Sequence, residues 1–193
     1  MNPQSPAAAV AGVSAALDAL AVPWFLTGSI ASSLHGIPRS TNAIDIVVML
    51  PPHLAGEFVR LLGDDYYADE TMIRTAFLRR QACNVIWLET MMKIDLMPPR
   101  FDFDGDAMVR RQRSSLSDGS GTDLAVSVAT AEDAILAKLV WHREGGAVSE
   151  RQLSDIRGIL GAQAGRLDRA YLDGWAKRLG LESQLLALNA SSA

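Results

Sequence analysis

Residues 27–48 read TGSIASSLHGIPRSTNAIDIVV and carry more structural information than any other part of the chain. The residues before them, VPWFLT at 22–27, predict a short strand, and Gly28-Ser29 predicts a tight turn. A helix is expected over 30–35, ended by Gly36 and Pro38. Residues 44–50, rich in Ile and Val, then predict a second strand. The expected order is strand, turn, helix, strand.

The same reading predicts the remaining elements. Helices are expected over 1–20 and 53–62, and strands over 83–88, 92–97 and 124–128. Two further helices are expected to begin at Thr130 and at Ser149, and a third to span 169–179 and end at Gly180. Residues 72–80 fit a helix or a strand. The sequence therefore predicts a mixed α/β (α+β) fold. We expect a β-sheet core over residues 1–128 and a C-terminal helical lobe over 129–193, packed on the core as one compact unit.

Two aspartates stand in strands that are otherwise apolar. Residues 43 and 45 project from the same face because a strand has a period of two, and Asp95 lies between Ile94 and Leu96. An unpaired charge in a buried strand costs several kcal/mol. Hard cations such as Mg²⁺ take oxygen ligands from one or two carboxylates and from substrate phosphates. Asp45 and Asp95 are therefore candidate metal ligands.

The Gly28-Ser29 turn is a candidate phosphate site. A glycine lets the backbone approach a phosphate, and the N-terminus of the helix that follows offers N–H groups. The alternative is that the turn only caps the helix, as most such turns do. By itself this dipeptide does not decide between the two.

With these residues in view, the chain resembles the nucleotidyltransferase superfamily, in which a Gly-Gly or Gly-Ser turn and a helix precede a strand carrying Asp-x-Asp, and a third Asp follows on a later strand. It looks most like the AbiEii-like prokaryotic proteins, some of them toxins of toxin–antitoxin pairs, which show a pattern similar to Arg-(Ala/Ser)-Thr-x-Asp-Ile-Asp. Their C-terminal part resembles EDAILAKLVWHREGGAVSERQLSDIRGIL and YLDGWAKRLGL. The resemblance extends from about Trp24 to Leu181.

The resemblance implies a Mg²⁺-dependent enzyme that transfers a nucleoside monophosphate from an NTP to an acceptor hydroxyl, with two metal ions at the site. It implies nucleotide-binding roles for Gly28, Ser29, Arg39, Thr41 and Lys138, metal-binding roles for Asp45 and Asp95, and a place near the triphosphate for Asp155. A Lys138–Asp155 salt bridge between packed helices is an equally good interpretation of those two residues, and both interpretations can hold together.

One position departs from the family pattern: Ala43 stands where the first Asp of Asp-x-Asp is expected. Either the carboxylate was lost naturally, or a deliberate Asp→Ala change was made to silence a catalytic site. The retained Arg39, Thr41, Asp45 and Asp95 favour the second explanation. As written, the chain is expected to be nearly inactive. The alternative function is a non-catalytic module, a natural pseudoenzyme that binds a nucleotide or a partner in a regulatory or antitoxin-like role.

The acceptor is not visible in the sequence. The toxin-like resemblance favours a tRNA 3′ end over a protein hydroxyl or a small molecule such as an aminoglycoside, and it implies a cognate antitoxin as a possible partner. The net charge is -4, so any RNA contact needs a local basic patch. Arg110, Arg111 and Arg113 are candidates for such a patch. A solvated surface of mixed charge explains these arginines as well. The single cysteine, Cys83, and the lack of an apolar run of about 18 residues predict a cytoplasmic protein without a membrane span.

Overall fold

The structure is a computed structural model that describes residues 5–117, 123–146 and 148–190. The chain divides into two compact units. Unit 1 comprises Met1–Leu26 and Thr41–Val128, and unit 2 comprises Thr27–Ser40 and Ala129–Ala193. The short segment Thr27–Ser40 therefore clusters with the C-terminal part of the chain and not with the residues on either side of it.

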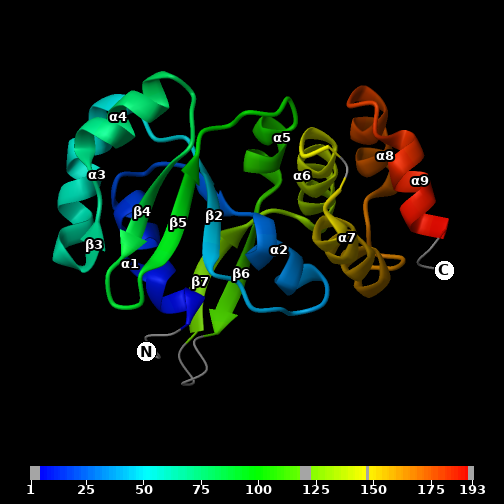
Figure 1. Cartoon of the computed structure of the whole chain (residues 1–193), viewed down its shortest axis with the longest axis horizontal. Coiled ribbons are helices and arrows are strands. Elements are labelled where there is room, and N and C mark those ends of the chain that lie inside the picture. Colours follow the sequence, from blue (N-terminus) through cyan, green and yellow to red (C-terminus); the bar gives the residue numbers. More distant parts are fainter. Residues whose placement is uncertain (1–4, 118–122, 147, 191–193) are drawn as a thin grey trace. The chain divides into compact units, whose positions relative to one another are not determined.

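Unit 1 is built on a mixed sheet whose strands follow the order β3-β4-β5-β2-β1-β7-β6 (Figure 1). The pairs β2/β5 and β1/β7 are parallel, and the other neighbours are antiparallel. The strands are β1 (Trp24–Leu26), β2 (Ala43–Val48), β3 (Tyr66–Tyr67), β4 (Cys83–Trp87), β5 (Met92–Met97), β6 (Gln112–Ser117) and β7 (Asp123–Val128). This sheet confirms the predicted β core and the predicted hairpin of β4 and β5.

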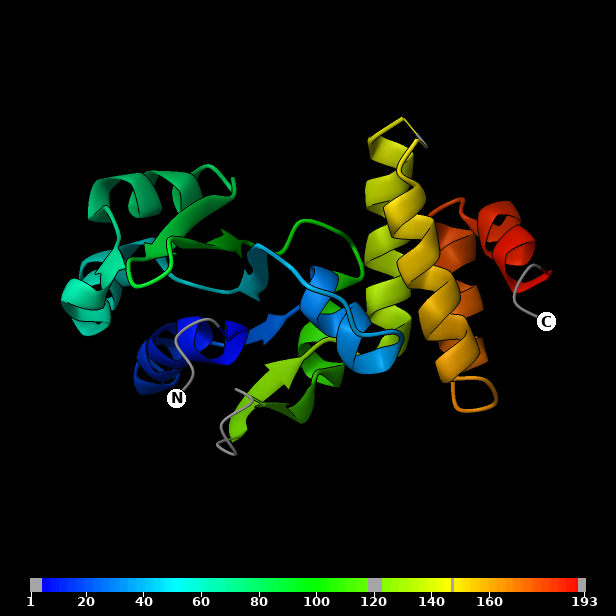
Figure 2. The ribbon, with the colours of Figure 1, turned by 60° about the horizontal axis from the view of Figure 1, so that its bottom comes forward.

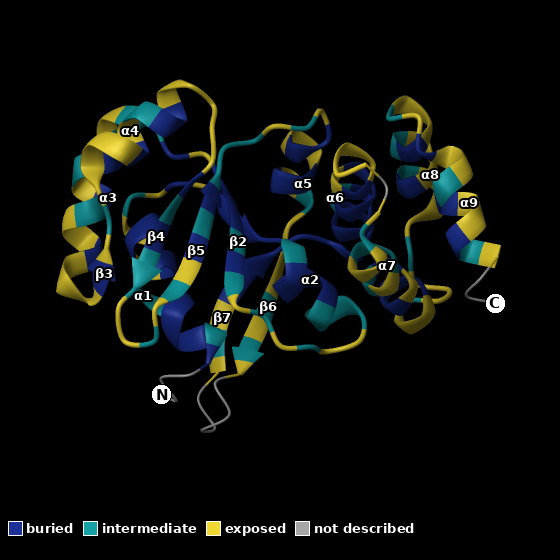
Figure 3. Cartoon of the chain, in the orientation of Figure 1, coloured by how far each residue is buried: buried dark blue, intermediate teal, exposed yellow. Residues whose placement is uncertain are grey.

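Helices α1 (Pro6–Ala19) and α4 (Glu70–Leu78) pack against strands of this sheet, and α3 (Ala55–Leu62), which follows the short helix η1 (Pro52–Leu54), packs against both helices. The short helix η2 (Gly63–Asp65) leads into β3, and α5 (Asp104–Arg110) precedes β6. Helix α1 contacts β5 and β7, and α4 contacts β4. Ile44, Ile46, Ile94 and Leu96 are fully buried, as the dark stripes of Figure 3 show on β2 and β5. The face that carries these residues forms the core of unit 1.

Unit 2 is helical. It contains α2 (Gly28–His35), α6 (Ala131–Glu144), α7 (Glu150–Ala162), α8 (Arg169–Arg178) and α9 (Glu182–Ala190). Helices α6 and α7 run side by side in Figure 2, and α2 packs against both. The predicted start of α6 is confirmed, because the Thr130 hydroxyl accepts the backbone N–H of Asp133. The predicted end of α8 is confirmed by Gly180, whose φ is +67°.

Three details differ from the sequence analysis or complete it. Residues 72–80, left open between helix and strand, belong largely to α4, because Asp69 caps that helix by accepting the N–H of Met72. Helix α7 begins after Ser149 as expected, but Ser149 makes no side-chain cap hydrogen bond, so the predicted capping box is wrong. Helix α5 and strands β3 and β6 were not predicted. In the part of the chain that is described, no helix is both long and apolar enough to cross a bilayer.

Candidate active site

The two aspartates predicted as metal ligands lie directly opposite each other. Strands β2 and β5 are parallel neighbours, and Asp45 pairs with Asp95 in their register. Residues paired in this way share one face of a sheet and are about 4.8 Å apart across the strands. The predicted placement of the two aspartates on adjacent strands is confirmed. Their binding of a metal stays a prediction.

The face that carries this pair is partly open to solvent. Ile44, Ile46 and Ile94 point to the buried face, so the alternation of the strands sends Asp45 and Asp95 to the other one. The Asp95 side chain is 23% exposed. The apolar residues next to Asp45 and Asp95 in sequence face away from the two carboxylates. The free-energy cost of placing these charges in the strands is therefore smaller than predicted.

Lys93 is a residue of this site that the sequence analysis gave no role. Its ammonium Nζ lies 3.0 Å from Oδ2 of Asp95, and in the register of the sheet Lys93 pairs with Ala43. The positive charge next to Asp95 thus comes from Lys93, which lies opposite Ala43, the position where a carboxylate was expected. The spacing of Lys93-Ile94-Asp95 was the available signal, since residues two apart on a strand share a face.

Thr41 shapes the backbone at the start of β2. Its hydroxyl donates to the carbonyl oxygen of Ala43 at 2.8 Å and lies 3.4 Å from the Ala43 amide nitrogen, which donates to it. This arrangement fixes the chain just before Asp45. The nucleotide-binding role that the family resemblance implies for Thr41 stays a prediction.

The donor set of this face fits one hard divalent cation. Among the described residues, no group of three or more His, Cys, Asp or Glu side chains is arranged to hold a metal ion. Two carboxylates in register suit a single Mg²⁺, which completes its coordination with water and substrate phosphate. A complete two-metal site would need a further carboxylate beside Asp45 and Asp95. Position 43 carries alanine and does not supply it. The two carboxylates therefore fit one metal ion, and the expected two-metal site, impaired by Ala43, stays a prediction.

Cys83, the single cysteine of the sequence, does not contribute a nucleophile. It is buried on β4. Burial raises the pKa of its thiol to about 11, and the negative charge of Asp95 adds to this. Since the thiolate is the reactive form, the Cys83 side chain is inert near neutral pH.

In unit 2, the Gly28-Ser29 turn forms the start of α2. Gly28 has a φ of +58°, in the left-handed region that favours glycine. The N-cap residue Thr27 makes no side-chain cap hydrogen bond, and Ser29 is buried. Glycine is thus required at position 28 by the backbone itself, and the phosphate-binding role remains a prediction.

In unit 2, Arg39 and Lys138 both contact the buried carboxylate of Asp155. Arg39 donates to Asp155 through Nε at 2.9 Å and Nη2 at 2.8 Å, and Lys138 Nζ lies 2.7 Å from Oδ2. Lys138 also donates to Gln152 at 3.0 Å. The side chains of Lys138 and Asp155 are 5% and 7% exposed. The ion pair that the sequence allowed as an alternative is therefore formed.

The electrostatics of this cluster favour the charged form of Asp155. Burial alone would raise the pKa of its carboxyl, but the hydrogen bonds and charges of Arg39 and Lys138 outweigh burial and lower it. Two cations on one carboxylate leave the cluster with a net positive charge. This charge is compatible with the phosphate role implied for Lys138 without demonstrating it.

Solved structures with the same arrangement of elements identify the fold. The chain matches a solution structure of the antibiotic-resistance factor ANT(2'')-Ia with a TM-score of 0.52 and 14% identity, over 97% of this chain and 99% of that one. It matches an antigenic nucleotidyltransferase-like protein from Paracoccidioides brasiliensis with a TM-score of 0.51 and 19% identity, over 95% of this chain and 94% of that one. The chain has the nucleotidyltransferase fold.

A third match is a structure with a bound ligand. It is the crystal structure of ANT(2")-Ia in complex with adenylyl-2"-tobramycin, with a TM-score of 0.51 and 14% identity, over 90% of this chain and 98% of that one. No protein-family model and no curated protein matches the chain. At these identities the nucleotidyltransferase fold is what the likeness establishes, and the predicted fold class is confirmed.

Proposed function

We propose that this chain belongs to an enzyme lineage that transfers a nucleoside monophosphate from an NTP to an acceptor hydroxyl. The observation that supports this most is the in-register pair Asp45 and Asp95 on the parallel strands β2 and β5 of a nucleotidyltransferase fold. Two carboxylates on one open face of a sheet are suited to hold Mg²⁺ beside a triphosphate. We assign them the role of metal ligands.

In the proposed reaction the acceptor oxygen forms a bond to the α-phosphorus, and the bond from that phosphorus to the pyrophosphate oxygen breaks. The hydroxyl proton leaves to solvent or a base, and pyrophosphate carries away the electron pair. Bound Mg²⁺ supplies charge neutralisation on the phosphates and a lower pKa for the attacking hydroxyl. Asp45 and Asp95 hold the cation, and Gly28, Ser29, Arg39, Thr41 and Lys138 are the proposed nucleotide-binding residues.

Ala43 sets the activity expected of this chain. A ligand shared between two metal ions would serve both the attacking and the leaving oxygen, so its absence weakens both. We therefore propose that the chain as written is nearly inactive, through a deliberate Asp→Ala change at position 43. The acceptor that we propose first is a tRNA 3′ end, as in a toxin with a cognate antitoxin. A small-molecule acceptor is the alternative, because one structural neighbour is solved with adenylyl-2"-tobramycin.

A second function, a non-catalytic nucleotide-binding or partner-binding module, has its own supporting observation. Lys93 pairs with Ala43 and contacts Asp95, so an ammonium group partly neutralises the carboxylate pair without any metal. A natural pseudoenzyme would tolerate or favour such an arrangement. The two functions differ in what happens when the carboxylate at position 43 is supplied.

The deciding experiment is Ala43→Asp. We expect Mg²⁺-dependent incorporation of labelled NTP into tRNA, protein or small-molecule acceptors to rise by roughly two to four orders of magnitude, for a transition state stabilised by about 3 to 5 kcal/mol. Ala43→Asn is the matched control, of similar size but uncharged, and should stay silent. A further Asp45→Asn in the Ala43→Asp protein should abolish the gain.

A stability measurement accompanies the assay. A carboxylate added beside Asp45 and Asp95 increases repulsion, which a bound cation relieves. Ala43→Asp should therefore melt at a lower temperature in EDTA and recover in Mg²⁺, whereas Ala43→Asn should melt alike in both. If Ala43→Asp is inactive on all acceptors and its melting temperature ignores Mg²⁺, the nucleotidyl transfer proposal is wrong.

A further inference from the structure

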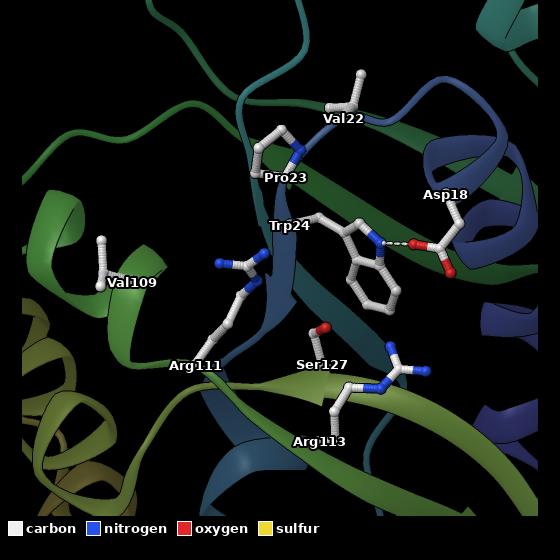
Figure 4. A pocket seen from close by; sticks show the side chains of 8 residues that line it. All are labelled: Asp18, Val22, Pro23, Trp24, Val109, Arg111, Arg113 and Ser127. Carbon is white, nitrogen blue, oxygen red and sulfur yellow. Dashed lines mark hydrogen bonds between the residues drawn. The ribbon is translucent and has the colours of Figure 1, made fainter.

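Unit 1 contains a hollow that is lined by residues other than the aspartate pair. It is a cavity of about 400 Å³ at the end of α1, the start of β1 and the turn from α5 into β6. Its lining includes Asp18, Trp24, Val109, Arg111 and Arg113, drawn in Figure 4. This volume is at the lower end of the range found for small-molecule sites in proteins.

Two arginines form the positive side of this cavity. Arg111 directly follows α5, and its Nη1 donates to the carbonyl oxygen of Met108; Arg113 lies on β6, opposite Ser127 of β7. Two residues apart in extended chain, their Cα atoms are about 7 Å apart. Planar guanidinium groups recognise carboxylate and phosphate oxygens through paired hydrogen bonds. One anionic group between them would offset the repulsion of the two like charges.

Asp18 contributes the negative charge of the lining and lies on the same side of Trp24 as the Arg113 guanidinium in Figure 4. Its Oδ1 accepts a hydrogen bond from Nε1 of Trp24 at 2.8 Å, shown by the dashed line of Figure 4. The indole of Trp24 is 2% exposed and therefore holds the carboxylate at a fixed place. A carboxylate oxygen has several lone-pair sites, so Asp18 can still accept from a hydroxyl or an ammonium group of a ligand.

The cavity also offers an apolar contact for the carbon skeleton of a ligand. Val109 lines the same cavity and is 84% exposed, so its apolar side chain is available to contact a ligand. The net charge of the two arginines and Asp18 is +1, so the cavity favours an anion. A uniformly basic surface for a nucleic-acid backbone would not place a fixed carboxylate within it.

We propose that this cavity binds a small molecule with an anionic phosphate or carboxylate group at one end and a hydroxyl or ammonium group at the other. Arg111 and Arg113 bind the anionic group, and Asp18, positioned by Trp24, binds the donor group. The proposal is independent of the metal-binding role of Asp45 and Asp95.

Calorimetric titration of the full chain tests it with four probes: O-phosphoethanolamine, β-alanine, inorganic phosphate and ethanolamine. O-Phosphoethanolamine and β-alanine compare phosphate with carboxylate, and at least one of them should bind more tightly than phosphate or ethanolamine alone. Arg111→Gln/Arg113→Gln should weaken the binding of that probe at least tenfold. Arg79→Gln/Arg151→Gln is the control with the same change in charge at exposed residues outside the cavity, and it should bind like the parent chain.

Asp18→Asn separates the two ends of the ligand. The asparagine oxygen can still accept from Trp24, so the fold is kept while the negative charge is lost. This variant should bind the probe that the parent chain prefers no more tightly than it binds phosphate. The proposal is overturned if the folded parent chain binds none of the probes, if the double arginine variant binds them equally well, or if only a single-stranded RNA oligonucleotide binds.

Discussion

Lys93 matters at the scale of single residues because it sets the charge that a metal ion would meet. Its ammonium is 3.0 Å from Asp95, and its side chain is 49% exposed. An ion pair this exposed contributes at most about 1 kcal/mol to folding. Its effect on a divalent cation is larger, since a unit charge about 5 Å from a divalent ion costs roughly 1.7 kcal/mol even in water. A metal ion bound as proposed would therefore compete with Lys93 for Asp95.

The prediction is that Lys93→Met binds Mg²⁺ or Mn²⁺ about twentyfold more tightly than the parent chain, as a free energy of this size implies. Calorimetric titration with either ion measures it. Lys177→Met, which removes an exposed lysine of α8, is the control and should leave the affinity unchanged. Equal affinities in Lys93→Met and the parent chain would mean that Asp95 does not hold the cation.

At the scale of elements, the contact between the end of α2 and helix α7 depends on a glycine, Gly36, which has no side chain. A Cβ added at Gly36 would stand 2.8 Å from the carbonyl carbon of Gly158 and 2.8 Å from the amide nitrogen of Ile159. These are backbone atoms, which cannot rotate away. Close packing of the two segments therefore requires glycine at position 36, although the sequence analysis assigned Gly36 only the role of a helix end.

We predict that Gly36→Ala lowers the free energy of unfolding by about 1 to 3 kcal/mol, the usual cost of overpacking. Gly161→Ala, in α7 itself, has no atom within 4 Å of the added Cβ and should raise it by about 0.5 to 1 kcal/mol through helix propensity. Urea denaturation compares the two variants. If both were equally stable, the close contact at Gly36 would be absent from the protein in solution.

At the scale of the whole molecule, Asp155 makes the stability depend on pH. The pKa of its carboxyl is lowered in the folded chain by hydrogen bonds and charges from Arg39 and Lys138, which outweigh the opposite effect of burial. A lowered pKa means that the stabilisation is complete above the pKa of the unfolded chain, about 4, and is lost as the pH falls through the folded value. Acid should therefore weaken unit 2 through this residue.

The variant Asp155→Asn should lose about 3 kcal/mol at pH 7, because it leaves the buried Lys138 ammonium without its carboxylate, and should lose less further stability below pH 4 than the parent chain. Denaturation at pH 7 and pH 3.5 gives both numbers. Glu150→Gln removes an exposed pair with Arg157 at 4.0 Å and is the control, with a change within about 0.5 kcal/mol. Parallel acid curves for Asp155→Asn and the parent chain would exclude the assigned role.

The elements with strong local signals could be predicted from the sequence. Strands β1, β2, β4, β5 and β7 follow from apolar runs between breakers, and helix α6 follows from its Thr130 cap. Helix α5 and strand β6 lie in residues 102–117, whose mixture of acids, arginines and serines has no clear period. The conformation of β6 depends on pairing with β7, which is a tertiary contact and leaves no local pattern.

For the candidate site, the sequence by itself determined which residues carry charge among apolar neighbours: Asp45, Asp95 and Lys138. The tertiary structure decided which partners they meet. Register on the sheet joins Asp45 to Asp95 and brings Lys93 opposite Ala43, while helix packing surrounds Asp155 with Arg39 and Lys138. Spacing along one strand or helix fixes the face that a side chain takes, but the contact between elements far apart in sequence depends on the packing of the whole core.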